Sequence, residues 1–112
     1  MEEAQETLFP ETIKFNQNKL PKVKPPYSYK TGAIYTGSWI TGVRHGKGKM
    51  VWPDGATYEG EWGHGEPTNY GVFKFPNGDE YHGKWAGNLM NGMGRFIHKS
   101  GAVYTGQWKN SK

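Results

Sequence analysis

The chain has 112 residues, 14 Lys and Arg against 10 Asp and Glu, a formal net charge of +4 and no cysteine. This length favours a single domain, and the lack of cysteine excludes a disulfide framework and a thiolate zinc site. No apolar stretch approaches the roughly 18 residues that a membrane-spanning helix needs. The acidic start, Met1–Glu6, lacks the apolar run of a secretory signal, so a cytoplasmic location is expected.

Glycine and aromatic residues dominate the composition. The chain has 17 glycines, and its 5 Trp, 7 Tyr and 5 Phe outnumber Leu, Ile and Val, which together total 12. A helical bundle would show the reverse balance and far less glycine. Disorder along the whole chain is also excluded, because aromatic residues are abundant and the net charge is low. The composition therefore predicts a folded domain whose apolar surface consists mainly of rings.

Residues 1–26 come first and differ from the rest of the chain. Residues 1–20 contain no turn signal, and the proline-rich stretch 21–26 favours an extended backbone. We expect an extended, partly disordered tail that becomes ordered on a partner. The tail contains neither Pro-x-x-Pro nor Pro-Pro-x-Tyr, so it is not expected to bind SH3 or WW domains.

A repeat with a period of 23 residues follows the tail. Units cover 35–57, 58–80 and 81–103, with a half unit at 27–34 and a partial unit at 104–112. Self-similarity with this period is typical of stacked supersecondary units. The landmarks are Tyr35, Tyr58, Tyr81 and Tyr104, then Gly37, Gly60, Gly83 and Gly106, then Trp39, Trp62, Trp85 and Trp108.

Each unit predicts two short strands. Residues 35–39 alternate so that Tyr35, Gly37 and Trp39 share one face, and residues 46–52 alternate in the same way. Pro53-Asp54-Gly55 then turns the chain, because Asp-Gly adopts positive φ readily and proline ends the strand. The connection between the two strands within one unit, from Ile40 to His45, is expected to be longer than the turn at Asp54-Gly55.

The pairing of glycine with aromatic residues predicts how the strands pack. A glycine weakens a strand unless its bare backbone is covered, and rings from neighbouring strands can lie over it. We therefore predict an all-β fold: an elongated, single-layer, twisted antiparallel sheet of stacked hairpins with one ring-covered face. The opposite face carries the charges. The net charge is +2 in 35–57, −4 in 58–80 and +3 in 81–103.

This pattern resembles the MORN (membrane occupation and recognition nexus) repeat over about residues 27–112. The similarity rests on Tyr58-Glu59-Gly60-Glu61-Trp62, Tyr81-His82-Gly83-Lys84-Trp85, Gly46-x-Gly48 and the turns Asp54-Gly55 and Asn77-Gly78. Three positions depart from it. Asn69 holds the repeat position that is glycine in the other units, at Gly46 and Gly92. Asn88 likewise holds the position of Gly42 and Gly65, and His98 holds the position of Trp52 and Phe75. Asparagine tolerates a left-handed backbone, so the fold is expected to survive these changes.

The resemblance implies a non-catalytic scaffold without a cofactor, which binds a segment of a partner protein in a groove on the curved aromatic face. Short, freestanding proteins with such repeats occur in motile cilia, including radial spokes, and in other cytoskeletal assemblies. The expected contact residues are the rings of that face. They are Tyr35, Trp39, Trp52, Tyr58, Trp62, Phe73, Phe75, Tyr81, Trp85, Phe96, Tyr104 and Trp108.

Two other functions remain open at this stage. The chain could be a peripheral membrane module whose Lys47, Lys49, Lys84 and Arg95 contact acidic phospholipids. It could also be a regulatory repeat from a longer enzyme, as in some lipid kinases and lysine methyltransferases. Its N-terminal methionine and the absence of a second domain argue against the enzyme interpretation.

Other site types are not expected. The four histidines occupy different repeat positions without metal-ligand spacing, and no nucleophile, base and acid can be placed together. Residues 44–49 combine glycine with basic side chains, which suits a phosphate, but their glycines recur with the repeat. Nucleic-acid binding is disfavoured, because rings and charges are predicted on opposite faces. We expect open sheet edges near Tyr27–Tyr29 and Tyr104–Trp108 to pair with another strand.

Overall fold

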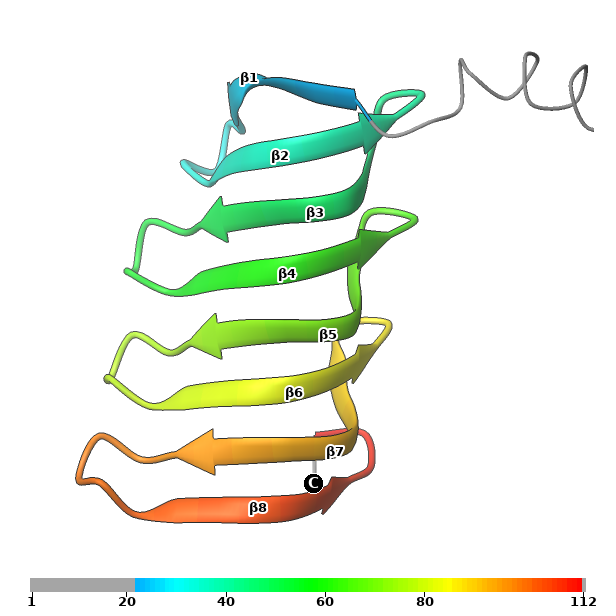
Figure 1. Ribbon diagram of the computed structural model, residues 1–112. Coiled ribbons are helices and arrows are strands. Elements are labelled where there is room, and N and C mark those ends of the chain that lie inside the picture. Colours follow the sequence, from blue (N-terminus) through cyan, green and yellow to red (C-terminus); the bar gives the residue numbers. More distant parts are fainter. Residues whose placement is uncertain (1–21, 112) are drawn as a thin grey trace, which may run out of the picture.

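The computed structural model describes residues 22–111 and forms one antiparallel sheet in which strand order equals chain order (Figure 1). This arrangement confirms the predicted all-β fold of stacked hairpins. Every strand pairs with its neighbours in the sequence, so each hairpin packs beside the next. The strands are β1 Lys22–Ser28, β2 Ile34–Ile40, β3 Val43–Val51, β4 Thr57–Gly63, β5 Glu66–Lys74, β6 Glu80–Ala86, β7 Leu89–Ile97 and β8 Val103–Trp108.

A row of glycines crosses the sheet from β2 to β8. Each glycine lies directly opposite a glycine of the adjacent strand, which leaves a strip of backbone without side chains. The row consists of Gly37, Gly48, Gly60, Gly71, Gly83, Gly94 and Gly106.

Tyrosine rings cover this strip, as the sequence predicted. Tyr35, Tyr58 and Tyr81 are 0% exposed. Each of these rings lies against the glycine of the next strand, where a Cβ on Gly48, Gly71 or Gly94 would overlap the ring. Each hydroxyl donates to the carbonyl three residues further on, at 2.8 Å to Ser38, 2.9 Å to Glu61 and 3.0 Å to Lys84. The ring is therefore held at both ends.

Tryptophans connect one tyrosine to the next. The ring of Trp62 lies 5.3 Å from Tyr35 and 5.2 Å from Tyr58, edge to face in both cases. Trp85 repeats the geometry between Tyr58 and Tyr81, at 5.4 Å and 5.3 Å. This arrangement is favoured between aromatic quadrupoles. The indole nitrogens of these two tryptophans donate to the glycine carbonyls of Gly48 and Gly71, at 3.0 Å and 3.2 Å.

The two kinds of turn have the opposite lengths to those predicted. β2 and β3 are joined by two residues, Thr41 and Gly42, because Ile40 pairs with Val43. Both turn residues have positive φ, 45° and 81°, which is the geometry that matches the twist of a tight hairpin. The residues assigned to a long loop instead extend β3, with a bulge where the register shifts between Gly37 and Trp39. The turn at Asp54-Gly55 spans five residues, 52–56.

Asparagine takes over the left-handed positions, as expected. Asn69 has φ 55° where Gly46 has 88° and Gly92 has 92°. Asn88 has φ 70° in the tight turn between β6 and β7. The fold therefore tolerates both departures from the repeat.

The sheet begins earlier than the repeat boundary at residue 27. β1 starts at Lys22, and it pairs with β2 from Lys22↔Trp39 to Ser28↔Ile34. The extended backbone expected for 21–26 is thus a strand from Lys22 onwards, with an irregular register between Lys24 and Tyr27. The prediction of a tail over residues 1–21 lies outside the described residues.

Candidate binding groove

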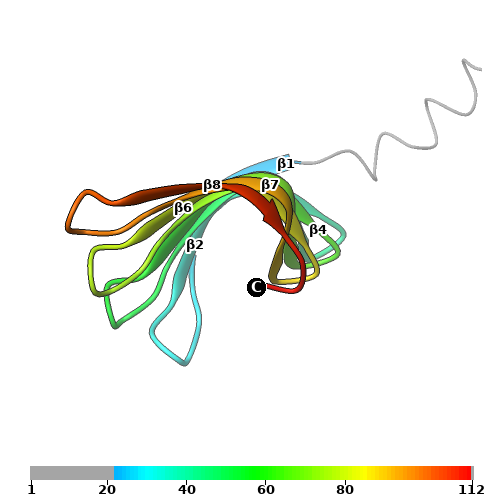
Figure 2. The ribbon, with the colours of Figure 1, turned by 90° about the horizontal axis from the view of Figure 1, so that it is seen from below.

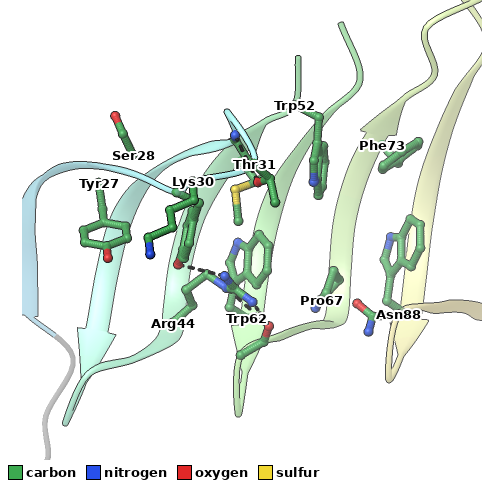
Figure 3. Close-up of a pocket in the computed structure, with 15 residues that line it drawn as sticks. Tyr27, Ser28, Lys30, Thr31, Arg44, Trp52, Trp62, Pro67, Phe73 and Asn88 are labelled. Carbon is green, nitrogen blue, oxygen red and sulfur yellow. Dashed lines mark hydrogen bonds between the residues drawn. The ribbon is translucent and has the colours of Figure 1, made fainter. Parts of the chain in front are cut away.

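The strands bend along their length, so the sheet forms a trough that runs in the direction in which the strands stack (Figure 2). A hollow of about 690 Å³ lies on its aromatic face, over the first two units. Figure 3 shows rings from several strands around this hollow, among them Trp52, Trp62 and Phe73, together with Arg44. A second hollow of about 500 Å³ adjoins it at β1 and shares Tyr27 and Tyr29. We call these two hollows together the groove.

The rings predicted to contact a partner fall into two groups. The tyrosines of the first three units have no exposed surface, and Trp62 and Trp85 are only 3% and 9% exposed. These rings form the floor and hold the fold, so a bound segment cannot rest on the tyrosines. The other predicted rings keep exposed surface, and Tyr104 is 53% exposed. They are Trp39, Trp52, Phe73, Phe75, Phe96, Tyr104 and Trp108.

A second row of rings runs beside the floor near the five-residue turns. Trp52 lies 5.8 Å from Phe73, and Phe73 lies 4.6 Å from Phe75. Phe75 continues the row to Phe96 at 5.6 Å, and Phe96 to His98 at 5.0 Å. The histidine therefore preserves the row. Half-buried rings of this kind offer apolar area at low conformational cost, which is what protein-binding surfaces use.

Arg44 is one of several groove residues that sequence reasoning missed, together with Lys24, Tyr27, Tyr29 and Lys30. Arg44 is the second residue of β3, opposite Trp39, and therefore lies on the aromatic face. Its Nη1 donates to the Tyr29 hydroxyl at 2.8 Å, and its Nη2 and Nε donate to the Gly65 carbonyl at 2.7 Å and 3.3 Å. The guanidinium also stacks 5.1 Å from the Trp62 ring centroid. The sequence contained a signal for this residue. Pro67 and Met90 hold the equivalent position in the next two units, so an arginine at this position occurs in the first unit and not in those two.

Burial extends the pH range over which the floor tyrosines stay neutral. Loss of solvent raises the pKa of Tyr35 to about 12, and it raises the pKa of Tyr58 and Tyr81 above their ordinary value. Each hydroxyl is a neutral donor to its carbonyl at physiological pH and stays so into the alkaline range. These groups hold the sheet together and offer no acid or base for chemistry.

The convex face carries the charges that the sequence placed opposite the rings. Lys47 lies opposite Glu61, and Lys49 lies opposite Glu59. Lys84 lies opposite Tyr70, and Arg95 lies between His82 and Thr105. Nearby, a bond of 2.8 Å to His82 lowers the pKa of Glu80. Four predicted lipid-contact residues thus share one face, but two of them face carboxylates.

Neither a metal centre nor a membrane helix emerges from the described part of the chain. Across residues 22–111, no three His, Cys, Asp or Glu side chains gather closely enough to hold a metal ion. His45 and His64 come together as a pair, with ring centroids 6.0 Å apart. Over the same range, no helix has the length and apolarity to cross a bilayer.

Comparison with protein families identifies the repeat. The MORN repeat model matches residues 35–57, 58–80, 81–103 and 104–112. The chain belongs to the MORN-repeat family. These matches have the same bounds as the three full units and the partial unit read from the sequence, and they do not include the half unit predicted at 27–34. A comparison with curated proteins finds no match. MORN repeats suggest a binding or scaffold role, and proteins built from them are generally non-enzymatic.

Proposed function

We propose that this MORN-repeat protein is a non-catalytic scaffold that holds a helix or an extended segment of a partner protein in its groove. The observation that carries the proposal is the row of half-buried rings beside a rigid floor. Trp52, Phe73 and Phe75 keep exposed surface while the tyrosines beneath the groove have none. Such a surface is preorganised, since its support does not have to rearrange when a segment binds.

Two neighbouring residues of β5 provide a matched test. Phe73 lies on the groove face and Val72 lies on the convex face, and both are half-buried. Tagged full-length chains carrying Phe73→Ala or Val72→Ala would be used for affinity purification from native tissue, with quantitative mass spectrometry. We expect the wild-type partner set to be lost with Phe73→Ala and kept with Val72→Ala. Loss with Val72→Ala alone would assign binding to the convex face and refute the groove.

We further propose a cytoskeletal setting, with an axonemal assembly of the radial-spoke type as the most specific form. The support is the family membership together with the half-buried rings of the groove, which suit a protein that joins others in an assembly. Immunogold labelling of isolated axonemes tests this setting. Axonemes without gold label, together with recovery of the protein only in the detergent-soluble fraction, would refute the axonemal setting.

Peripheral membrane binding is the alternative. Lys84 and Arg95 could approach anionic headgroups, whereas the carboxylates opposite Lys47 and Lys49 weaken the attraction. Sedimentation with acidic and neutral liposomes decides between the two. Salt-sensitive binding to the acidic vesicles that is lost in Lys84→Gln and Arg95→Gln would favour the membrane function. No binding at low salt would eliminate it.

Edge pairing is a separate proposal about assembly. β1 and β8 each have a neighbour on one side only in the described sheet, so each could accept a strand from a second copy or from a partner. The two edges differ. β1 contains Pro25 and Pro26, whereas β8 contains no proline, and proline removes a donor from the edge. We therefore propose β8 as the pairing edge.

A further inference from the structure

The β1–β3 end of the groove is cationic. Among the described residues, three basic side chains line the two hollows: Lys24 and Lys30 from β1 and the turn after it, and Arg44 from β3. No Asp or Glu from this part of the chain lines either hollow. Figure 3 shows Lys30 and Arg44 on the same side of the hollow. This segregation contrasts with the convex face, where lysines and glutamates alternate across the strands.

Arg44 has binding capacity left over. A guanidinium has five N–H groups, and the bonds to Tyr29 and Gly65 use three of them. Among residues 22–111 no carboxylate lies within ion-pair distance of Arg44, since the pairs found there are His82–Glu80 and His98–Asp79. The Trp62 ring and the Gly65 carbonyl fix the orientation of the fork. A fixed, half-buried guanidinium that has no carboxylate partner among residues 22–111 suits a carboxylate.

The charge also gives the groove a direction. The positions equivalent to Arg44 in the next two units are Pro67 and Met90, which are both buried and uncharged. From β3 towards β5, the groove therefore changes from cationic to apolar. A segment with its acidic residues at one end and its apolar residues along the rest would fit in one orientation only.

On the basis of the proposed function, we infer that the groove binds an amphipathic protein segment whose carboxylates lie at the β1–β3 end against Arg44. Apolar side chains of that segment pack over Trp52 and Phe73. A flat bilayer is a poorer fit, because the three basic residues line hollows of the trough (Figure 2). Arg44 is then the residue that sets specificity, and the rings supply most of the contact area.

A peptide library tests the inference whatever the identity of the natural partner. Peptides of about 16 residues, about 24 Å as a helix, would carry a fixed apolar pattern and polar positions randomised over Glu, Gln, Lys, Ser and Thr. Selection is run against the full chain, against Arg44→Met and against Lys49→Met. Methionine occupies the equivalent position at Met90, so the sheet accommodates it. Lys49→Met removes the same charge from the convex face.

The expected result is enrichment of glutamate at one end of the peptides selected by the wild type and by Lys49→Met, and no such enrichment with Arg44→Met. An enriched peptide should lose about tenfold in affinity when that glutamate becomes glutamine, as measured by fluorescence anisotropy. Lys30→Met should reduce the enrichment in the same direction. This residue is exposed, so its replacement checks the result without disturbing packing.

Three outcomes overturn the inference. Selected peptides that bind well but lack acidic enrichment would leave the groove as a docking site and refute the role of Arg44. A failure of every peptide to enrich over the input would refute the proposed function itself. Arg44-dependent binding to acidic vesicles, with no peptide enriched, would assign the cationic end to lipid headgroups instead.

Discussion

Single glycines determine where the aromatic rings can lie. Gly71 has no side chain, and the Tyr58 ring occupies the space that a Cβ would need. The same contact recurs between Tyr35 and Gly48 and between Tyr81 and Gly94. Each ring buries itself against backbone of its own sheet, so the domain gains a core without a second layer. Glycine at these positions thus serves packing more than flexibility.

Gly71→Ala should destabilise the protein far more than Gly106→Ala. Both glycines belong to the row, but the Tyr58 ring lies on Gly71 from the adjacent strand and is 0% exposed, whereas Tyr104 lies beside Gly106 in the same strand, is 53% exposed and can move away. We expect a loss of about 2–3 kcal/mol for Gly71→Ala and less than about 1 kcal/mol for Gly106→Ala. Urea unfolding of both variants checks this. Equal losses would contradict the ring-over-glycine account.

Trp62→Ala should cost about 3–5 kcal/mol, because the ring is 3% exposed and contacts two tyrosines. Lys49→Ala on the exposed convex face should change stability by no more than about 0.5 kcal/mol. Chemical denaturation followed by circular dichroism measures both. If the two variants lost stability equally, our assignment of the faces would be wrong.

Alkaline pH should unfold the protein through its buried tyrosines. Burial raises the pKa of Tyr35 to about 12, above the value of about 10 that tyrosine has in an unfolded chain. This contribution to stability is complete below pH 10 and is lost as the pH rises towards 12, since the unfolded state then ionises first. Denaturant midpoints at pH 8, 10 and 11.5 should fall across the series. Tyr58→Phe, which cannot ionise, should lessen that fall.

At the scale of the hairpin, the bulge and the tight turn set the curvature. One residue at the bulge has positive φ in each of the three hairpins, namely Gly46, Asn69 and Gly92. The two residues of each tight turn also have positive φ. This repetition tilts each β-hairpin in the same way, which lets the sheet curl into a trough (Figure 2). Asn69 is the one bulge residue of the three that is not glycine.

Asn69→Gly should therefore leave stability unchanged or raise it, while Asn69→Ala should lower it by about 1 kcal/mol or more relative to the glycine variant. The reason is the left-handed backbone, with φ 55°, which glycine adopts freely and alanine does not. Thermal unfolding of the two variants measures the difference. An alanine variant as stable as the glycine variant would mean that the bulge relaxes.

The sequence predicted some of these features and not others. Period and alternation placed Tyr35 and Trp39 on one face and Lys49 on the other, because side-chain direction in a strand follows directly from spacing. The tight turn was missed, since Thr41 and His64 are not typical residues for positive φ. The position of Arg44 in the groove was missed because it depends on Tyr29 and Gly65, which lie in neighbouring hairpins.

For the whole molecule, the two ends of the sheet differ in what they leave uncovered. Tyr104 is 53% exposed although its three counterparts are 0% exposed, because in the described sheet β8 has no neighbour beyond it to supply a glycine beneath that ring. A strand added to β8 would cover that ring. At the other end of the sheet, the exposed Val23 lies in β1, whose two prolines make this edge less able to accept a strand.

Light scattering at increasing concentration tests pairing through β8. We expect association that is abolished by Thr105→Lys with Gln107→Lys, since like charges on facing edges repel. Val23→Lys, which places a charge on the β1 edge, should leave association intact. A strict monomer at all concentrations, with no partner strand on β8, would refute the proposal.

The identity of strand order and chain order has a mechanical consequence. In the described sheet β1 pairs with β2 but with no later strand, and β8 pairs with β7 but with no earlier one. A force applied to the two ends of the chain would therefore separate the antiparallel strand pairs one after another. It would not act on all the strand pairs at the same time. Such a molecule should yield at low force and lengthen in steps, so it is suited to positioning its ligand and poorly suited to bearing tension along its own chain.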